Sequence, residues 1–194
     1  MGYGTVNDRV STYLDEAEAV VRSISRTDVR AVVERLYEGW RDRRTTYIIG
    51  NGGSASTASH MMNDLNKMTT LAGAPRFRAI ALTDNVPYMT AIGNDISYAD
   101  VFVEQLKNLL LPKDILIALS GSGNSENIIR ATQYAHEVGA FVIGLCGQPG
   151  SRLCQTSDAV VTIPAKIICQ QEDAHLIINH TIALALRDRI AESA

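Results

Sequence analysis

The sequence predicts an α/β fold built on a parallel sheet that helices cover on both faces. Two observations carry this prediction: short apolar runs alternate with helical patterns from about residue 45 onward, and two of these runs lead into loops rich in Gly and Ser. Strands that are apolar throughout and separated by helices are typical of a buried parallel sheet. In such a sheet ligands bind at the carboxyl ends of the strands, which is where both loops fall.

The bulk composition is that of a soluble, single-domain protein. The 194 residues are 46% hydrophobic and 20% charged, and the formal net charge of −3 gives no reason to expect nucleic-acid or membrane binding. No apolar stretch approaches the ~20 residues of a membrane span, and the polar, acidic start does not resemble a signal peptide. The three cysteines (Cys146, Cys154 and Cys169) lack metal-ligand spacing, so we expect a cytoplasmic protein with buried thiols.

Two amphipathic helices are expected ahead of the α/β repeat. Apolar residues recur at three- and four-residue intervals from Val6 to Ile24, and a second stripe runs from Val29 to Trp40. We expect residues 1–44 to be this helical pair, part of the same domain and used for subunit association. Residues 45–194 then form the α/β unit.

The α/β unit contains five expected strands and four expected long helices. The strands are Thr46–Ile49, Phe77–Leu82, Asp114–Leu119, Phe141–Leu145 and Ala159–Ile163. The helices are Ser54–Lys67, Ala99–Leu110, Ser125–Val138 and Glu172–Ile190, with a short one near Ser151. Because the last helix is apolar on nearly every side, we expect it to be buried, in part by another subunit.

Each Gly–Ser loop has the composition of a phosphate-binding site. Gly lets a ligand approach the backbone closely, Ser hydroxyls donate hydrogen bonds, and a helix N-terminus adds free N–H groups and a favourable dipole. The stronger candidate runs from Ser120 to Ser125, and the other from Asn51 to Ser54. For either loop alone an ordinary helix cap is the alternative. Two such loops in one chain indicate a phosphorylated small molecule.

Titratable side chains gather on two of the expected helices. His60 and Asp64 lie four residues apart on one helix face, where they can bind a divalent metal, act as an acid–base pair or make an incidental contact. Glu172 and His180 are roughly 12 Å apart along a regular helix. They therefore meet only through an ion or substrate, or if Glu172 lies on an irregular first turn. Spacing alone favours the nearer pair of Glu172 and His175.

A third polar segment, Gly93–Asp95, follows an apolar stretch. It fits a rim loop that contacts sugar hydroxyls, and it fits equally well a helix that ends with a cap at Gly93.

Taken together, these motifs resemble a known family. GNGGS (Gly50–Ser54), TAIGND (Thr90–Asp95) and SGSGNS (Ser120–Ser125), followed by His175 and His180, resemble the sugar isomerase (SIS) domain. Within that superfamily the closest likeness is to the phosphoheptose isomerases, also called sedoheptulose 7-phosphate isomerases. The resemblance implies a flavodoxin-like fold and a homotetramer with active sites between subunits.

The resemblance also implies which residues form the site. Substrate would be bound by Asn51, Gly52, Gly53, Ser54, Asp95, Ser120, Gly121, Ser122, Asn124 and Ser125, with the phosphate on the three serines of the second loop. A divalent metal, zinc in the first place, would be bound by His60, Asp64, Glu172 and His180. The acid–base groups would be drawn from Asp64, Glu172 and His180.

Three residues depart from the family pattern. Asp64 stands where Glu is typical, Glu172 where Gln is typical, and Cys169 where many relatives have an acidic residue. Asp is shorter than Glu by one methylene, so its carboxylate stops roughly 1.5 Å further back. One hypothesis is a role exchange, in which Asp64 anchors metal or water while Glu172 takes the proton.

We therefore predict an aldose–ketose isomerase that converts sedoheptulose 7-phosphate to D-glycero-D-manno-heptose 7-phosphate through an enediol. The reaction needs a base, an acid, charge stabilisation at the oxygens and a phosphate anchor. One alternative is an isomerase of another phosphosugar. The other is a non-catalytic SIS-domain regulator that binds a phosphosugar or a protein, which would be expected to lose the acid–base residues.

Overall fold

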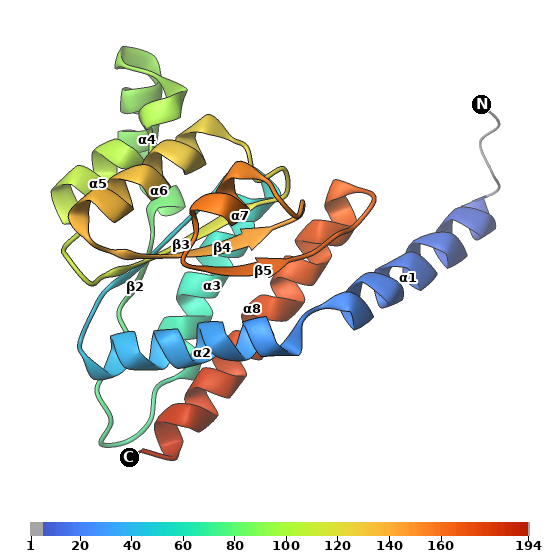
Figure 1. Ribbon diagram of the computed structural model, residues 1–194, viewed down its shortest axis with the longest axis horizontal. Helices are drawn as coiled ribbons and strands as arrows, with labels where there is room; N and C mark the ends of the chain where they lie inside the picture. The colour runs from blue at the N-terminus through green and yellow to red at the C-terminus, as the bar shows by residue number, and fades with distance from the viewer. Residues whose placement is uncertain (1–5, 194) are drawn as a thin grey trace.

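A five-stranded parallel sheet forms the centre of the protein, whose computed structural model describes residues 6–193 (Figure 1). The strands are β1 (Thr46–Gly50), β2 (Ala79–Ala81), β3 (Ile115–Ser120), β4 (Phe141–Cys146) and β5 (Ala159–Thr162). They lie in the order β2-β1-β3-β4-β5, and every neighbouring pair is parallel. This is the flavodoxin-like order, so the predicted fold class is confirmed.

Two apolar cores, one on each face, explain why the strands read as apolar runs. Every residue of β1 and β3 is buried, and side chains alternate between the cores: Ile48 and Ile117 face one, Ile49 and Leu116 the other. The first face is covered by α2 (Arg26–Arg41), α3 (Gly53–Met68) and α8 (Ile168–Ala191). The second is covered by α5 (Val103–Leu109), α6 (Glu126–Val138) and α7 (Arg152–Thr156).

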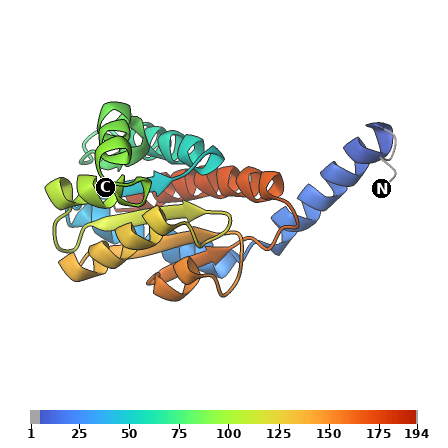
Figure 2. The ribbon, with the colours of Figure 1, turned by 90° about the horizontal axis from the view of Figure 1, so that it is seen from above.

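The expected N-terminal helical pair is present in the described residues as α1 (Val6–Ser23) and α2, while residues 1–5 lie outside them. The predicted stripe of α2 is buried, and the hydroxyl of Ser25 caps this helix by accepting the N–H of Asp28. By contrast, α1 projects away from the rest of the molecule (Figures 1 and 2). Its exposed apolar side chains include Val6, Val10 and Leu14.

Polar contacts join α1 to the beginning of α8. The hydroxyl of Tyr13 donates a 2.5 Å hydrogen bond to Asp173, and the carboxylate of Glu16 accepts one of 2.8 Å from Gln170.

Among the described residues, no helix combines the length and the apolar character needed to cross a membrane.

Two element predictions were only partly right. β2 has three residues rather than the predicted Phe77–Leu82. The helix predicted for Ala99–Leu110 is divided into a 3₁₀ turn, η2 (Tyr98–Asp100), and α5. The hydroxyl of Ser97 accepts the N–H of Ala99 and begins η2, whereas the break falls at Val101 and Phe102, between η2 and α5.

A further helix, α4 (Val86–Asp95), follows the short 3₁₀ turn η1 (Leu82–Asp84) and was not predicted. It has no buried residue, so the sequence carries no apolar stripe to reveal it. Gly93–Asp95 form its last turn and Ile96 is its cap. Both the rim loop and the cap at Gly93 were therefore wrong predictions.

Candidate active site

The two Gly–Ser loops leave the sheet side by side. They follow β1 and β3, which are neighbours with Gly50 opposite Leu119, and the strand order reverses between these two strands. A reversal of this kind leaves a crevice at the carboxyl ends of the strands where flavodoxin-like proteins bind ligands. The fold thus brings together two motifs that are separated by about 70 residues of chain.

The second loop is organised by its own side chains. Ser120 Oγ accepts the N–H of Gly123 at 3.0 Å and lies 3.5 Å from Ser122 Oγ, which in turn accepts the N–H of Asn124 at 3.3 Å. Gly123 has a φ of +64°, and the side chain of Ser151 occupies the space of a Cβ there, so only glycine fits. One of these two hydroxyls donates to the other, and the remaining one keeps its hydrogen to donate to an anion. Ser125 stands at the N-cap of α6, and its side chain makes no capping bond.

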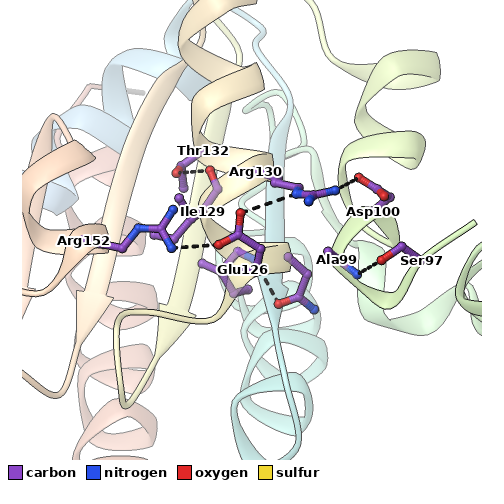
Figure 3. A network of polar contacts seen from close by, with 10 residues as sticks. Ser97, Ala99, Asp100, Glu126, Ile129, Arg130, Thr132 and Arg152 are labelled. Atoms are coloured by element: carbon purple, nitrogen blue, oxygen red, sulfur yellow. Dashed lines mark hydrogen bonds and ion pairs between the residues drawn. The ribbon is translucent and has the colours of Figure 1, made fainter.

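Charges beside this loop are balanced (Figure 3). Glu126, in the first turn of α6, accepts hydrogen bonds from Arg152 at 2.8 Å and from Arg130 at 3.4 Å. The bond from Arg152, followed by the weaker attraction of Arg130, lowers the pKa of Glu126. Arg130 also donates to Asp100 at 2.8 Å, which ties α6 to η2. The carboxylate that would repel a phosphate at this helix end is thereby neutralised.

The first loop begins α3. Gly52 is its N-cap and has a φ of +56°, while Ser54 is buried and donates its N–H to the carbonyl of Asn51 at 3.0 Å. The side chain of Asn51 bonds to Asn127 of α6 and Tyr98 of η2. Asp95, by contrast, is exposed at the end of α4, where it accepts a hydrogen bond from Asn94.

A triangle of potential metal ligands lies further along α3, where this helix packs against α8. His60 Nε2 is 3.3 Å from Asp64 Oδ2 and 3.3 Å from His180 Nε2, and the third side, from His180 Nε2 to Asp64 Oδ2, is 3.6 Å. The Asp64 carboxylate is buried and also accepts hydrogen bonds from Asn63 and Asn179. Both histidines are about half exposed, so the triangle opens to solvent in the single chain.

Glu172 is not part of this triangle. α8 begins at Ile168, so Glu172 lies on regular helix and the irregular first turn was a wrong expectation. Its carboxylate instead packs against Gly53 at the start of α3, in the space that a Cβ would need, which explains the glycine at that position. Three of the four proposed metal ligands therefore come together within one chain, and the fourth stands by the first loop.

His175 belongs to the core rather than to the site. Its side chain is 1% exposed, and neither ring nitrogen has a hydrogen-bond partner among residues 6–193. Burial lowers its pKa to about 4, so the imidazole is neutral. The pairing of Glu172 with His175 that spacing favoured is therefore wrong.

Several site residues escaped the sequence reasoning. Gln171 covers Gly121 and Gly147 beside the second loop, Asn179 bonds to Asp64, and Asn127 bonds to Asn51. All three are buried amides on helices. A buried amide needs a partner, so an Asn or Gln at a core position of an amphipathic stripe was the available signal.

Comparison with known proteins agrees with this fold. The model of the SIS domain family matches residues 12–147, so the protein is a SIS-domain protein. The phosphoheptose isomerase of Geotalea daltonii is 30% identical over 188 residues, which cover 94% of this chain and 96% of that protein. That of Mycobacterium tuberculosis is 33% identical over 154 residues, or 79% of this chain and 78% of the relative.

Solved structures give the same picture. The phosphoheptose isomerase of Neisseria gonorrhoeae matches with a TM-score of 0.87 and 27% identity, covering 94% of this chain and 98% of that one. The chain therefore belongs to the phosphoheptose isomerase family, and it is an isomerase. The sugar isomerase domain of a transcription factor from Sphaerobacter thermophilus matches at 17% identity and a TM-score of 0.66, covering 97% of this chain and 96% of that one. That likeness concerns the fold alone.

Proposed function

We propose that this protein converts sedoheptulose 7-phosphate to D-glycero-D-manno-heptose 7-phosphate by aldose–ketose isomerisation. The observation that carries the proposal is the triangle of His60, Asp64 and His180 in a chain of this family. A regulator that only binds a phosphosugar has no need of such a group. Isomerisation of a different phosphosugar is the alternative that the experiment below distinguishes.

A divalent metal, zinc in the first place, is part of the proposal. Ligand atoms at the corners of a tetrahedron are separated by about 1.6 times the metal–ligand bond length. The sides of 3.3 to 3.6 Å thus correspond to bonds of about 2.0–2.2 Å, the range of zinc with imidazole nitrogen and carboxylate oxygen. When bound, such an ion polarises the carbonyl and hydroxyl oxygens of the substrate.

The remaining chemistry is assigned to side chains of this chain. The hydroxyls of Ser120, Ser122 and Ser125, with the first N–H groups of α6, hold the phosphate and so fix the sugar. Asn51, Ser54 and Asp95 contact the sugar chain. A carboxylate removes the proton next to the carbonyl and returns it to the neighbouring carbon. His180 would protonate the oxygen only in protein without metal, because a nitrogen that binds the ion has no proton to donate.

The structure supports Glu172 rather than Asp64 as that carboxylate. Both oxygens of Asp64 accept hydrogen bonds, from Asn63 at 3.1 Å and from Asn179 at 2.9 Å, which suits a ligand that is held in place. Glu172 lies beside the first loop, at the carboxyl ends of the strands. The hypothesis of a role exchange between the two acids is therefore retained.

Assembly into a homotetramer with active sites between subunits is also proposed. Gln171, by the phosphate loop, and His180, in the triangle, are nine residues or about 13.5 Å apart along α8. Ile177 and Leu184 flank His180 on the exposed face of this helix, with 40% and 48% of their surfaces accessible. A second copy packed on this face would bury both side chains and bring its own loop to the triangle.

The domain and compartment assignments stay part of this proposal. Residues 1–44 serve association and residues 45–194 form the SIS unit; the family match begins at residue 12, which supports one domain. A cytoplasmic location is supported by three cysteines that are all free.

The decisive experiment follows sedoheptulose 7-phosphate by NMR with purified protein, with metal analysis of the same sample. We expect the aldose signals to appear, about one zinc per chain, and loss of both in His180→Gln. His136→Gln changes an exposed histidine that pairs with Asp158 and should behave as the unmodified protein. If another ketose phosphate is converted in preference to sedoheptulose 7-phosphate, the proposed substrate is wrong. If no ketose phosphate is converted, the proposed enzymatic activity is wrong.

A further inference from the structure

The side chain of Asn51 is held by residues from two other segments. Asn51 directly follows β1, and its amide pairs reciprocally with that of Asn127, on the first turn of α6: Nδ2 of each donates to Oδ1 of the other, at 2.9 and 2.8 Å. The hydroxyl of Tyr98, in η2, donates to Asn51 Oδ1 at 3.0 Å. These contacts join the two Gly–Ser loops and the segment after α4.

The orientation of both amides follows from one backbone group. The N–H of Ile128 can only donate, and it lies 3.0 Å from Asn127 Oδ1, so that atom is the oxygen. Asn127 Nδ2 must then face the oxygen of Asn51. Asn127 is 2% exposed, which leaves its amide no solvent alternative.

The consequence falls on Asn51. Its Oδ1 accepts from both Asn127 and Tyr98, so both of its lone pairs are used. Its Nδ2 uses one hydrogen toward Asn127, and the second is not used within the pair. Asn51 therefore has only an N–H to offer to a ligand.

We infer that Asn127 and Tyr98 are positioning residues, which make Asn51 a hydrogen-bond donor toward an oxygen of the sugar. The inference rests on the proposed function for the ligand, a phosphorylated sugar chain, but not for the reaction. It assigns a polarity to this part of the site: an acceptor oxygen of the sugar lies opposite Asn51. The phosphate anchor is a separate contact on the second loop.

Asn127→Asp tests the inference with almost no change in shape. The new oxygen faces Asn51 Oδ1, and either orientation of the Asn51 amide then keeps only one of the two hydrogen bonds of the pair, so residue 127 no longer holds Asn51 in one orientation. We expect binding of the heptitol 7-phosphate, a substrate analogue without a carbonyl, to weaken about tenfold in calorimetry, the value of one lost hydrogen bond. Inorganic phosphate should lose less affinity, about two- to fivefold at low ionic strength, because its binding reports only the negative charge that the substitution adds on the first turn of α6. Asn108→Asp, an exposed change with the same charge, is the matched control.

Tyr98→Phe is the second variant, and it cannot fail through misfolding of the core because Tyr98 is exposed. We expect a weakening of about threefold for the heptitol phosphate alone, since Asn127 still orients Asn51. Tyr88→Phe removes the hydroxyl that accepts from Asn108 and is its control. If the unmodified protein binds the heptitol phosphate without turning over sedoheptulose 7-phosphate, the proposed reaction is wrong and this test still stands.

Two results would overturn the inference. Unchanged heptitol phosphate binding in both variants would show that Asn51 does not face the sugar. An equal loss of phosphate and heptitol phosphate binding would show that the pair only holds the loops together.

Discussion

Asn179, the residue before His180 on α8, donates a 2.9 Å hydrogen bond from Nδ2 to Oδ2 of Asp64. That oxygen is also the corner of the triangle with the two histidines. A carboxylate that ligates a metal is held in orientation by such bonds, and their loss costs metal affinity. The helix that carries one ligand thus also fixes another on its neighbour.

Replacing Asn179 with Ala should therefore weaken metal binding while leaving all three ligands in place. We expect a 10- to 100-fold rise in the zinc dissociation constant, measured by competition with a chromophoric chelator. Asn108→Ala, on an exposed face of α5, is the control. An unchanged zinc affinity in folded Asn179→Ala would contradict the role of this bond.

Neutralising Glu172 and Asp64 one at a time should have different effects on metal binding and turnover. If they have exchanged roles, Glu172→Gln keeps its metal and loses about 10²- to 10⁴-fold in kcat, because a general acid–base group is removed. Asp64→Asn should lose metal and turnover together. Asp188→Asn, on an exposed position of the same helix, is the control. The exchange fails if Glu172→Gln keeps its turnover and Asp64→Asn abolishes it with the metal still bound.

Glu126→Gln should strengthen phosphate binding. The change leaves Arg152 without its carboxylate partner beside the second loop, while Arg130 keeps its ion pair with Asp100. We expect a two- to fivefold lower dissociation constant for inorganic phosphate at low ionic strength, a gain that shrinks as salt is added. Glu137→Gln, near the other end of α6, is the comparison. A loss of affinity, or an equal gain in both variants, would argue against this electrostatic effect.

His175 should make stability depend on pH. Its pKa in the folded protein is about 4 because of burial, against about 6.5 when unfolded, so the unfolded chain binds the extra proton first. The burial of the neutral imidazole therefore contributes fully to the free energy of unfolding above about pH 6.5. This contribution is lost as the pH falls toward 4.

The check compares urea unfolding of the unmodified protein and His175→Gln between pH 7 and pH 4, with chelator present and at one protein concentration. Between pH 7 and pH 4 the unmodified protein should lose about 3 kcal/mol more unfolding free energy than His175→Gln. His136→Gln, at an exposed histidine, is the comparison. A difference that does not vary with pH would mean that His175 is not buried as a neutral group.

Much of the fold could be predicted because buried parallel strands are apolar at every position and the helices that cover them are striped. α4 was missed because no residue of it is buried, so its sequence lacks the pattern on which such a prediction depends. The two parts of the broken helix before β3, η2 and α5, were merged because only Val101 and Phe102 separate them, and both are buried apolar residues that fit the pattern of one continuous helix.

The site was predictable in its composition and less so in its connections. His60 and Asp64 share a face because of helix spacing alone, whereas the approach of His180 to them depends on how α3 and α8 pack. The Asn51–Asn127 pair joins residues 76 apart. No periodicity predicts such a contact, since it depends on the order of β1 and β3 in the sheet.

The course of α8 has a consequence for how this protein tolerates change. Two site residues of this helix lie nine residues apart. Gln171 contacts the glycines beside the second loop, and His180 completes the triangle with His60 and Asp64. Deleting or inserting one residue between them would turn His180 by about 100° around the axis and move it about 1.5 Å along it. The number of residues between Gln171 and His180 therefore fixes the position of His180 relative to the second loop. Substitutions on the outer face of α8 keep this spacing, but an insertion or deletion would move His180 away from His60 and Asp64.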